Sequence, residues 1–389
     1  MKKLFIFLLI FITVNFSLFS IIPRFYGARS LSLGYASVAC SFDINSIFVN
    51  PSLLSSVSYP ISGYQYSHSY LDYKNYLDDL KVIISNDLKN FTDLKDIEKE
   101  NLFVKLKGLF DSKHGIYGFK SNDPGFITKD YGFSVSFVNT AVISPNKSDV
   151  LSKKIGEISN IDIASLNMNF IGLKYTKYSL AYSFKISKAV SFGVGLHLLK
   201  GKSADFNSSI TNDIFSPGSD SKAYLEHGWK SAEHKFTKIV TDLSFAADIG
   251  KYFKLGVIIK NVGNPKLSTN EREIVMEKRV IAGLAFRPDM KWGIYFDMDV
   301  LKSDLLFNGE KMQPVSFGIE RGFFYNKFFL RAGFLSDLTE PHFLGKKSNI
   351  LYGLGLGFNI HNIIVDLGLG IDHGGKLCNL AISGMFILK

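Results

Sequence analysis

The stretch NIIVDLGLGIDH, residues 362–373, decides the fold. Its large apolar residues share one parity: Ile363, Val365, Leu367, Leu369 and Ile371. Asp366 and Asp372 take the other parity. A period of two residues is typical of a β-strand, and a run of about 10 to 12 residues matches a tilted membrane-spanning strand better than the usual five or six. This segment therefore predicts a strand with one face in lipid.

The same alternation recurs from about residue 160 to the C-terminus. The parity opposite the large apolar residues is rich in Gly, Ala and Ser, and it carries charges of both signs: Arg287, Asp297, Asp299, Glu320, Arg331, Asp366 and Asp372. A soluble sandwich would also alternate, but strand length and this crowded small and charged face favour a transmembrane barrel with a polar lumen. We expect the lumenal charges to pair with one another, with a selectivity constriction as the alternative.

Pattern and turn residues divide the chain into about 14 strands, an even number that allows closure. The expected ranges are 59–71, 129–144, 160–172, 176–186, 190–201, 236–250, 252–261, 275–287, 291–302, 313–322, 326–337, 348–359, 362–373 and 376–388. Short links, such as 187–189 and 360–361, fall at one end of this barrel, and long links, such as 202–235, fall at the other. Outer-membrane barrels alternate short periplasmic turns with longer outer loops. The sequence thus predicts an all-β, antiparallel barrel over residues 58–389.

The N-terminus resembles a secretory signal peptide. Lys2 and Lys3 precede an apolar run from Leu4 to Val14, and polar residues follow up to Ser20. We expect residues 1–20 to be cleaved on export to the outer membrane, with an uncleaved anchor as the alternative. After residue 22 the sequence has no uninterrupted apolar run of the roughly 18 residues that a spanning helix needs.

Composition and motifs exclude several classes of function. Apolar residues make up 46% of the chain and charged residues 21%, which excludes a disordered protein. The net charge is +10, but the lysines are scattered and no nucleic-acid-binding spacing is present, so we expect no nucleic-acid partner. Two cysteines without a C-x-x-C pair predict neither a disulfide scaffold nor a zinc site. Because hydrolase, metalloprotease and nucleotide motifs are missing as well, we expect no enzyme, no catalytic residue, no metal and no cofactor.

Residues 73–128 are expected to form a helical insertion after the first strand. Apolar residues at three- and four-residue spacing, among them Leu77, Leu80, Ile84 and Leu88, stand between polar ones. A solvated helical pair over the barrel mouth explains this pattern, and a partner-docking element is the alternative.

Residues 21–57 resemble the N-terminal hatch of the FadL and PorV group of outer-membrane barrels. The shared features are a Gly-Ala-Arg start, a Gly-x-Ala step, an acidic residue and an Asn-Pro-small motif. In this chain they correspond to Gly27, Arg29, Gly34, Asp43, Asn50 and Pro51, with Ser52 where the family usually has Ala. The resemblance implies a hatch segment that occupies the lumen.

The rest of the chain resembles the TraF-like barrels of conjugal transfer systems in the helical insertion and in three short stretches. These are Gly256 to Val262, Ala282 to Pro288, and Leu330 to Phe334 with the alternating glycines Gly353, Gly355 and Gly357. The likeness to FadL implies passage of a small hydrophobic molecule, with the hatch moving around Asn50 and Pro51. The likeness to PorV and TraF implies instead a non-transporting platform for a secretion or conjugation partner. Both roles place the chain among outer-membrane lipids.

Overall fold

The computed structural model describes ten segments of the chain. They are residues 27–41, 43–72, 92–111, 116–145, 157–209, 228–289, 291–304, 311–339, 350–372 and 377–388. The signal peptide expected at 1–20 and the apolar spacing at 77–88 lie outside them. No helix within these segments is long and apolar enough to cross a membrane.

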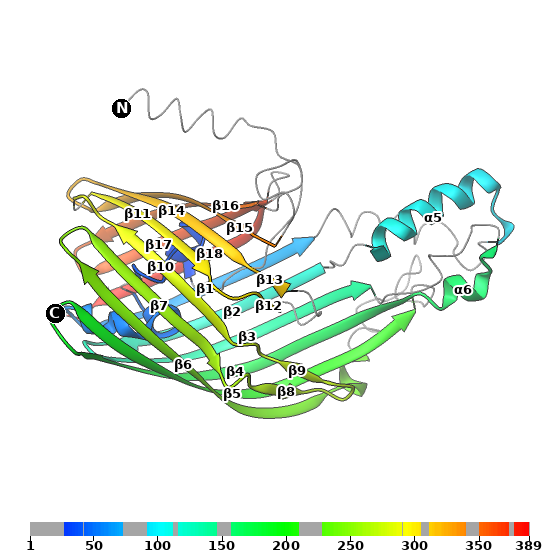
Figure 1. The fold of residues 1–389 in the computed structure, drawn as a ribbon, viewed down its shortest axis with the longest axis horizontal. Helices are drawn as coiled ribbons and strands as arrows, with labels where there is room; N and C mark the ends of the chain where they lie inside the picture. The colour runs from blue at the N-terminus through cyan, green and yellow to red at the C-terminus, as the bar shows by residue number, and fades with distance from the viewer. Residues whose placement is uncertain are drawn as a thin grey trace, which may run out of the picture.

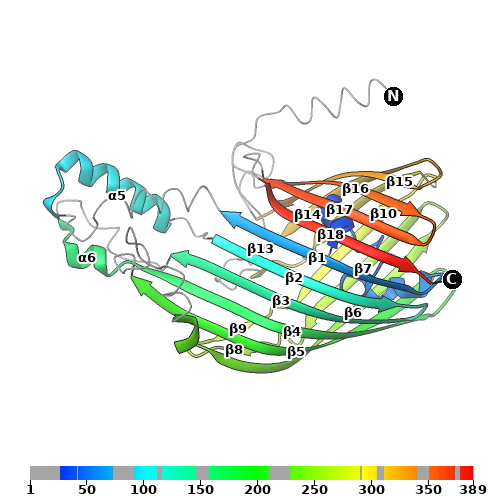
Figure 2. The ribbon, with the colours of Figure 1, turned by 180° about the vertical axis from the view of Figure 1, so that it is seen from behind.

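Fourteen antiparallel strands in the described segments close into a single barrel (Figures 1 and 2). Their bounds are β1 (Ile61–Asp72), β2 (Ile116–Ile127), β3 (Tyr131–Pro145), β4 (Asn167–Lys185), β5 (Val190–Ser209), β6 (His234–Ile249), β7 (Phe253–Val262), β10 (Arg279–Phe286), β11 (Trp292–Asp299), β14 (Pro314–Phe323), β15 (Phe328–Asp337), β16 (Ile350–Ile360), β17 (Ile363–Asp372) and β18 (Leu377–Ile387). Closure is made by β1 and β18, which pair from Ile61 opposite Ile387 to Ser69 opposite Asn379. The predicted fold class is confirmed.

Smaller elements complete the chain. Two short hairpins, β8 (Lys266–Ser268) with β9 (Glu273–Val275) and β12 (Ser303–Asp304) with β13 (Lys311–Met312), lie in the connections from β7 to β10 and from β11 to β14. The helical elements are α2 (Gly27–Ser32), α3 (Ser46–Val49), the 3₁₀ helix η1 (Pro51–Ser56), α5 (Asp96–Asp111) and α6 (Asn160–Ala164). In Figure 1, α5 and α6 lie beyond the strands, at the end opposite the C-terminus.

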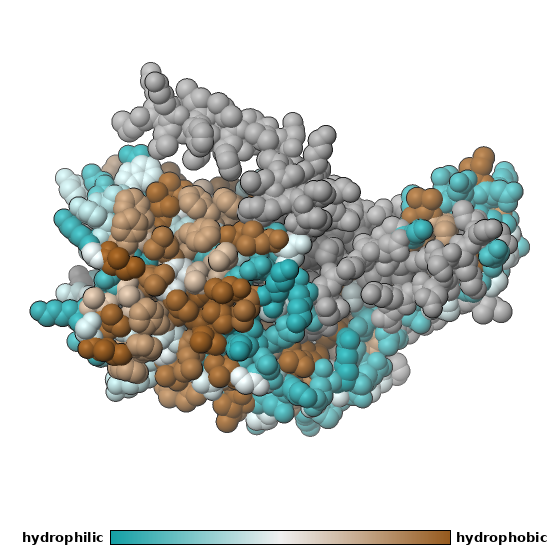
Figure 3. All heavy atoms as spheres, viewed as in Figure 1, coloured by the Kyte–Doolittle hydropathy of each residue, from teal (hydrophilic) through white to brown (hydrophobic). Residues whose placement is uncertain are grey.

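The outer wall is apolar and the inner wall small and charged, as the alternation predicts. Leu354 and Leu330 keep 46% and 43% of their surface exposed, whereas Asp366 on the other parity keeps 1%. Figure 3 shows apolar residues gathered over the barrel wall and hydrophilic ones over the hairpins and strand ends beside it. Soluble proteins rarely expose so large an apolar surface, and a closed sheet leaves no backbone edge unpaired in lipid. This is the surface of a transmembrane barrel.

One strand was missed in the sequence analysis. The expectation that all of 73–128 is a helical insertion is wrong, because residues 116–127 form β2 between β1 and β3. The segment Ser121-Asn-Asp-Pro-Gly125 has the residues of a turn. Pairing with β1 is nevertheless continuous, while pairing with β3 skips Asp123 and Pro124. Two flanking strands override a local turn preference.

One strand was predicted as two. The ranges 160–172 and 176–186 are wrong as separate strands: β4 runs without a break from Asn167 to Lys185 and pairs with β3 and β5 along its length. Lys174 stands among the outward-facing, mostly apolar residues of β4, and this polar residue was taken for part of a connection between two strands. The two errors have opposite signs, so the predicted total of about 14 strands still holds.

The two ends of the barrel differ, as expected. The turns after β2, β4, β6, β10, β14 and β16 are short and lie at the end where β18 finishes, which we call the short-turn end. The connections after β1, β3, β5, β7, β11 and β15 are longer and lie at the other end, the long-link end. Strands β3 to β6 extend farthest toward the long-link end in Figures 1 and 2.

A cation on the lipid-facing wall should destabilise this barrel. We expect Leu354→Arg to lower the free energy of unfolding by about 2–4 kcal/mol, because a guanidinium in the apolar band loses its hydration. Urea titration of the protein refolded into phospholipid vesicles measures the change. Leu301→Arg, at a residue 42% exposed just after β11, is the matched control and should change stability little. Equal losses in the two variants would contradict a lipid-facing Leu354.

Candidate functional site

Residues 27–57, which we call the hatch, fill the lumen of the barrel. Helix α2 lies against β16, β17 and β18, while η1 lies against β4, β5 and β6 on the opposite side of the lumen. Nearly every described hatch residue is buried, including Leu33, Ile47, Leu53 and Leu54 at 0–1% exposure. The hatch therefore spans the lumen and contacts opposite walls.

Lumenal glycines let the hatch backbone touch the wall. A Cβ on Gly353 would lie 2.1 Å from the carbonyl oxygen of Leu31, and one on Gly368 would lie 2.4 Å from that of Ala28. The same holds for further glycines whose added Cβ would overlap hatch backbone atoms: Gly193, Gly256, Gly318 and Gly333. Of the alternating glycines on β16, Gly353 meets hatch backbone and Gly355 meets the Ser32 side chain of the hatch, whereas Gly357 faces the side chains of Asp366 and Arg331.

Arg29 connects the hatch to the wall by an ion pair. Its Nε and Nη2 each lie 3.1 Å from an oxygen of the Glu320 carboxylate on β14, and its Nη1 donates to the Cys40 carbonyl at 2.7 Å. The side chains of Arg29 and Glu320 keep only 13% and 9% exposure. A two-pronged guanidinium–carboxylate contact fixes orientation as well as distance.

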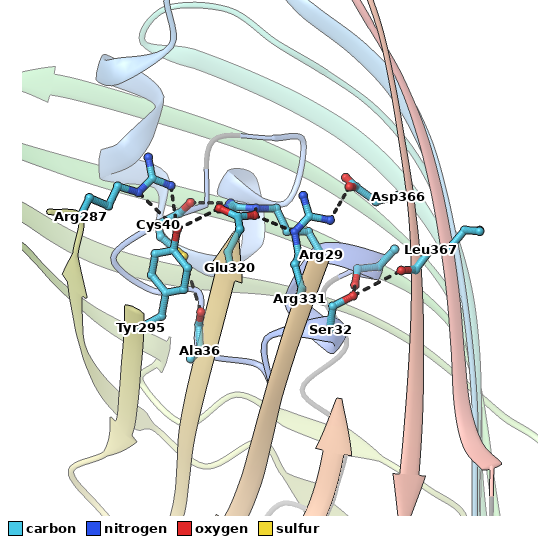
Figure 4. A network of polar contacts seen from close by, with 11 residues as sticks. Arg29, Ser32, Ala36, Cys40, Arg287, Tyr295, Glu320, Arg331, Asp366 and Leu367 are labelled. Carbon is cyan, nitrogen blue, oxygen red and sulfur yellow. Dashed lines mark hydrogen bonds and ion pairs between the residues drawn. The ribbon is translucent and has the colours of Figure 1, made fainter. Parts of the chain in front are cut away.

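The same carboxylate joins two neighbouring strands (Figure 4). Arg331 Nε on β15 lies 2.6 Å from Glu320 Oε2, and Arg331 Nη1 lies 2.5 Å from Asp366 Oδ1 on β17. Tyr295 on β11 donates its hydroxyl to Glu320 Oε1 at 3.0 Å, and Arg287 donates to that hydroxyl at 3.1 and 3.2 Å. Four strands and the hatch thus meet in one network of lumenal charges.

Asp297 binds the hatch backbone. Its Oδ2 accepts the N–H groups of Ser37 and Val38 at 2.7 and 2.9 Å. Nearby, Gly34 has a φ of +61°, and a Cβ there would lie 2.3 Å from the backbone nitrogen of Phe334. Both features explain the Gly-x-Ala turn, because a residue with a side chain would fit neither the backbone angle nor the space.

The Asn-Pro-Ser motif holds the far side of the hatch. Asn50 Nδ2 donates to the Val38 carbonyl at 2.8 Å and to the Phe245 carbonyl on β6 at 3.3 Å. Pro51 begins η1, where its missing N–H leaves no donor unsatisfied. The Ser52 carbonyl accepts hydroxyls from Ser183 and Ser191, each at 2.9 Å. These contacts are neutral hydrogen bonds, unlike those of Arg29.

The remaining predicted residues have different surroundings. Asp43 Oδ1 accepts from Ser41 Oγ and from the Asn45 backbone at 2.9 Å, so it shapes the hatch locally. Gly27 has a φ of +68° and starts α2. Asp299 pairs with Arg279 on the neighbouring strand at 2.8 Å. The side chain of Asp372 lies outside what the structure describes.

Sequence reasoning missed a second buried polar group around His197. Its Nδ1 lies 2.9 Å from Ser179 Oγ, and its Nε2 lies 3.3 Å from Asp242 Oδ2. All three side chains point into the lumen from β4, β5 and β6, and they are 1–4% exposed. Their shared parity on neighbouring strands was visible in the sequence, but the register that aligns them was not.

Hatch residue Phe48 covers this group. Lys177 Nζ lies 4.0 Å from the centre of the Phe48 ring, and Lys260 Nζ donates to the Phe48 carbonyl at 3.0 Å. The imidazole of His197 stands 6.2 Å from the same ring. Ser179, His197 and Asp242 are the residue types of a hydrolase triad, but here all three are buried at 1–4% exposure, with the Phe48 ring of the hatch near His197.

Toward the long-link end the lumen holds an apolar cluster beside the small and polar side chains that were expected, such as Ser203 and Asp205. One cluster joins hatch residues Ala28, Leu31 and Tyr35 to side chains of the wall and the hairpins. Its wall members include Val138, Val142, Leu173, Leu199, Phe236, Val240, Leu335 and Leu351. We call this cluster the apolar chamber. The sequence correctly predicted which alternate residues face the lumen. On β3 to β6, however, both faces carry apolar residues, so the alternation did not reveal this apolar cluster.

The two short hairpins contribute to the outer side of the chamber. Leu267 and Ile274 on β8 and β9, and Met312 on β13, belong to the same cluster at 1–6% exposure. The β8–β9 hairpin is held by Arg272, whose Nε lies 2.7 Å from Asp205 Oδ2 on β5. Chamber, hatch and hairpins therefore form a continuous apolar column inside the barrel.

Below the hatch, at the short-turn end, a cavity of about 790 Å³ opens. Its lining joins the charge network to the turns, and it includes Arg29, Glu320, Arg331, Lys251, Tyr252 and Asp289. The network thus lies between this cavity, a vestibule lined partly by charged side chains, and the apolar chamber.

Comparison with known proteins establishes the fold. No protein-family model matches the chain, and no curated protein matches it in sequence. Among solved structures it is similar to the CymD monoaromatic hydrocarbon channel, with a TM-score of 0.55, 11% identity and coverage of 96% of this chain and 99% of that one.

It is also similar to the P. putida toluene transporter TodX, with a TM-score of 0.51, 11% identity and coverage of 93% and 98%. A Pseudomonas aeruginosa FadL homologue gives a TM-score of 0.51 at 9% identity, with coverage of 96% and 100%. At these identities the likeness shows a shared barrel architecture.

Enlarging a lumenal glycine should release the hatch. In Gly353→Ala the new methyl group would overlap the Leu31 carbonyl, and overpacking of about 1–3 kcal/mol should speed proteolysis within residues 27–57 by about tenfold. Limited proteolysis with mass mapping measures the rate. Gly384→Ala on β18 is the control, because a Cβ there meets nothing within 4 Å. Unchanged cleavage in Gly353→Ala would show that the hatch does not depend on this contact.

Removing the shared carboxylate should destabilise the folded protein. Glu320→Gln leaves Arg29 and Arg331 buried with less counter-charge, and we expect a loss on the order of 3 kcal/mol in the free energy of unfolding. Glu273→Gln is the control: its partner Lys266 is exposed, so that loss should stay below about 1 kcal/mol. Urea titration in vesicles compares them. Similar small losses in both would mean that the network contributes little.

Proposed function

We propose that this protein passes a small hydrophobic molecule across the outer membrane. The observation that carries the proposal is the apolar chamber, a cluster running from the β8–β9 hairpin to the hatch inside a closed barrel. A channel for ions or sugars needs a water-filled lumen, whereas an apolar interior favours an apolar solute. The names of the similar structures, a monoaromatic hydrocarbon channel and a toluene transporter, point to the same substrate class.

Orientation and export follow from the same proposal. The long-link end faces outside and the short-turn end faces the periplasm, which is the arrangement of other outer-membrane barrels. Residues 1–20 then act as the cleaved signal peptide that brings the chain to this membrane.

Passage requires the hatch to move, because the chamber is packed and its floor is hatch backbone and side chains. The two sides of the hatch differ in the strength of their attachment. Buried ion pairs with Glu320 hold Arg29. On the other side, neutral hydrogen bonds hold Asn50 and Ser52, and Lys260 donates one charge-assisted bond to the Phe48 carbonyl. Charge-assisted contacts are roughly twice as strong as neutral ones. The Asn50–Pro51 side is therefore the one we expect to move, with α2 as the fixed side.

A polar group in the chamber should slow passage. We expect Leu199→Asn and Val240→Asn to reduce uptake of radiolabelled toluene roughly tenfold, because an unpaired amide there costs about 1–3 kcal/mol to desolvate and repels an apolar solute. Uptake is measured in cells that express the chain and have no other hydrocarbon channel.

Val104→Asn is the matched control, since Val104 is 62% exposed on α5, outside the barrel. It should leave uptake unchanged at equal amounts of folded protein. If wild-type cells took up toluene no faster than cells without the protein, the proposal that the protein passes a hydrophobic molecule would be wrong. The platform for a secretion or conjugation partner would then be the remaining hypothesis.

A further inference from the structure

A row of basic and amide side chains crosses the outer wall of six neighbouring strands. Each residue is the register partner of the next, from β1 to β6: His68, Lys120, Asn139, Lys174, Lys202 and Lys235. Their side chains face outward. Five of the residues are exposed, and the side chain of Lys202 is 45% exposed. Figure 2 shows β1 to β5 side by side on this face. We call these six residues the cation row.

The row concentrates like charges. Lys174 lies directly opposite Lys202, and Lys202 directly opposite Lys235. Like charges at opposed positions destabilise a sheet. Among the described residues, the one ion pair of the row joins Lys202 Nζ to Glu233 Oε1 at 2.7 Å. The other cations of the row have no carboxylate of the described residues at ion-pair distance, and Lys120 Nζ lies 5.7 Å from the centre of the Tyr66 ring.

On β4, the cation row meets the edge of the apolar band at Lys174. Toward the short-turn end, the outer parity of β3 to β6 becomes apolar within a few residues, with Phe137, Tyr178, Leu198 and Ile239 exposed at 39–70%. On β4, the roughly ten residues from Lys174 to Phe184 rise about 25 Å along the barrel axis for a strand tilted by about 40°. That height equals the apolar band of an outer-membrane barrel. Lys174 therefore stands where hydrocarbon gives way to lipid headgroups.

The wall is hollowed at the row. A cavity of about 460 Å³ is lined by His68, Lys120, Asn139, Lys174 and Trp229, among others. Trp229 packs over Gly172, where a Cβ would lie 2.1 Å from its ring, so it forms a side of this hollow next to Lys174. Ammonium and amide donors beside an indole at a membrane boundary suit a phosphorylated headgroup.

We propose that the cation row binds the phosphate groups of anionic lipids in the leaflet at the long-link end. Lys120 and Lys174 are the central contacts, because both line the hollow and they flank Asn139 in the register. The inference rests on the membrane placement in the proposed function and is independent of transport.

The test measures lipid binding to the purified, full barrel in dodecyl maltoside micelles by native mass spectrometry. The probes are bis-phosphorylated lipid A and the same lipid without its phosphates. We expect wild type to retain the phosphorylated probe selectively, and Lys120→Gln with Lys174→Gln to weaken its binding about tenfold or more, because each lysine near an anionic lipid surface contributes. Lys120→Arg with Lys174→Arg should restore it, which separates charge from folding.

Lys188→Gln with Lys327→Gln is the matched control, because it removes two exposed lysines from short turns. That variant should bind the lipid like wild type. Equal weakening in both glutamine variants, or equal binding of the two probes, would overturn the proposal. Displacement of the lipid by inorganic phosphate at the same phosphate concentration would also overturn it, since the site would then be one for free anions. Toluene uptake by the Lys120 and Lys174 variant tests the proposed function separately.

Discussion

Closure of the sheet is the constraint on which the rest of the structure depends. In lipid, every backbone N–H and C=O must find a partner within the protein, and the pairing of β1 with β18 removes the last free edge. A closed ring of fourteen strands encloses more space than wall side chains alone can fill. The hatch fills that space, and lumenal glycines bring its backbone into contact with the wall.

The hatch separates two environments inside the barrel. Toward the long-link end it forms the floor of an apolar chamber, and toward the short-turn end it borders a polar vestibule. Arg29 stands at this boundary, where Glu320 neutralises it and Arg331 links that carboxylate to Asp366. Buried charges of this kind are costly unless each has a partner, so the network positions the hatch rather than adding much net stability. A molecule crossing the barrel would leave an apolar environment for a polar one at this level.

The outer wall, like the lumen, has an apolar region and a polar region at different levels along the barrel axis. Its apolar band contacts hydrocarbon, and on β4 this band ends at Lys174 of the cation row. Lys174 shows how one residue can mislead pattern reading: it breaks the apolar parity of β4 because it stands above the lipid, and the sequence analysis divided the strand there. Asp123 and Pro124 misled in the opposite direction, since residues typical of a turn lie inside β2.

The sequence by itself determined the closed antiparallel barrel, the parity that faces lipid, and the ends at which short and long links lie. These follow from local alternation, which each strand carries alone. Only the tertiary structure decided which lumenal groups meet, because Arg29 and Glu320 are 291 positions apart and strand register brings His197 to Ser179 and Asp242. The tertiary structure also decided that an apolar cluster lies in the lumen toward the long-link end. Where both faces of a strand are apolar, residue type does not show which face contacts lipid and which faces the lumen. Only the curvature of the closed sheet shows this.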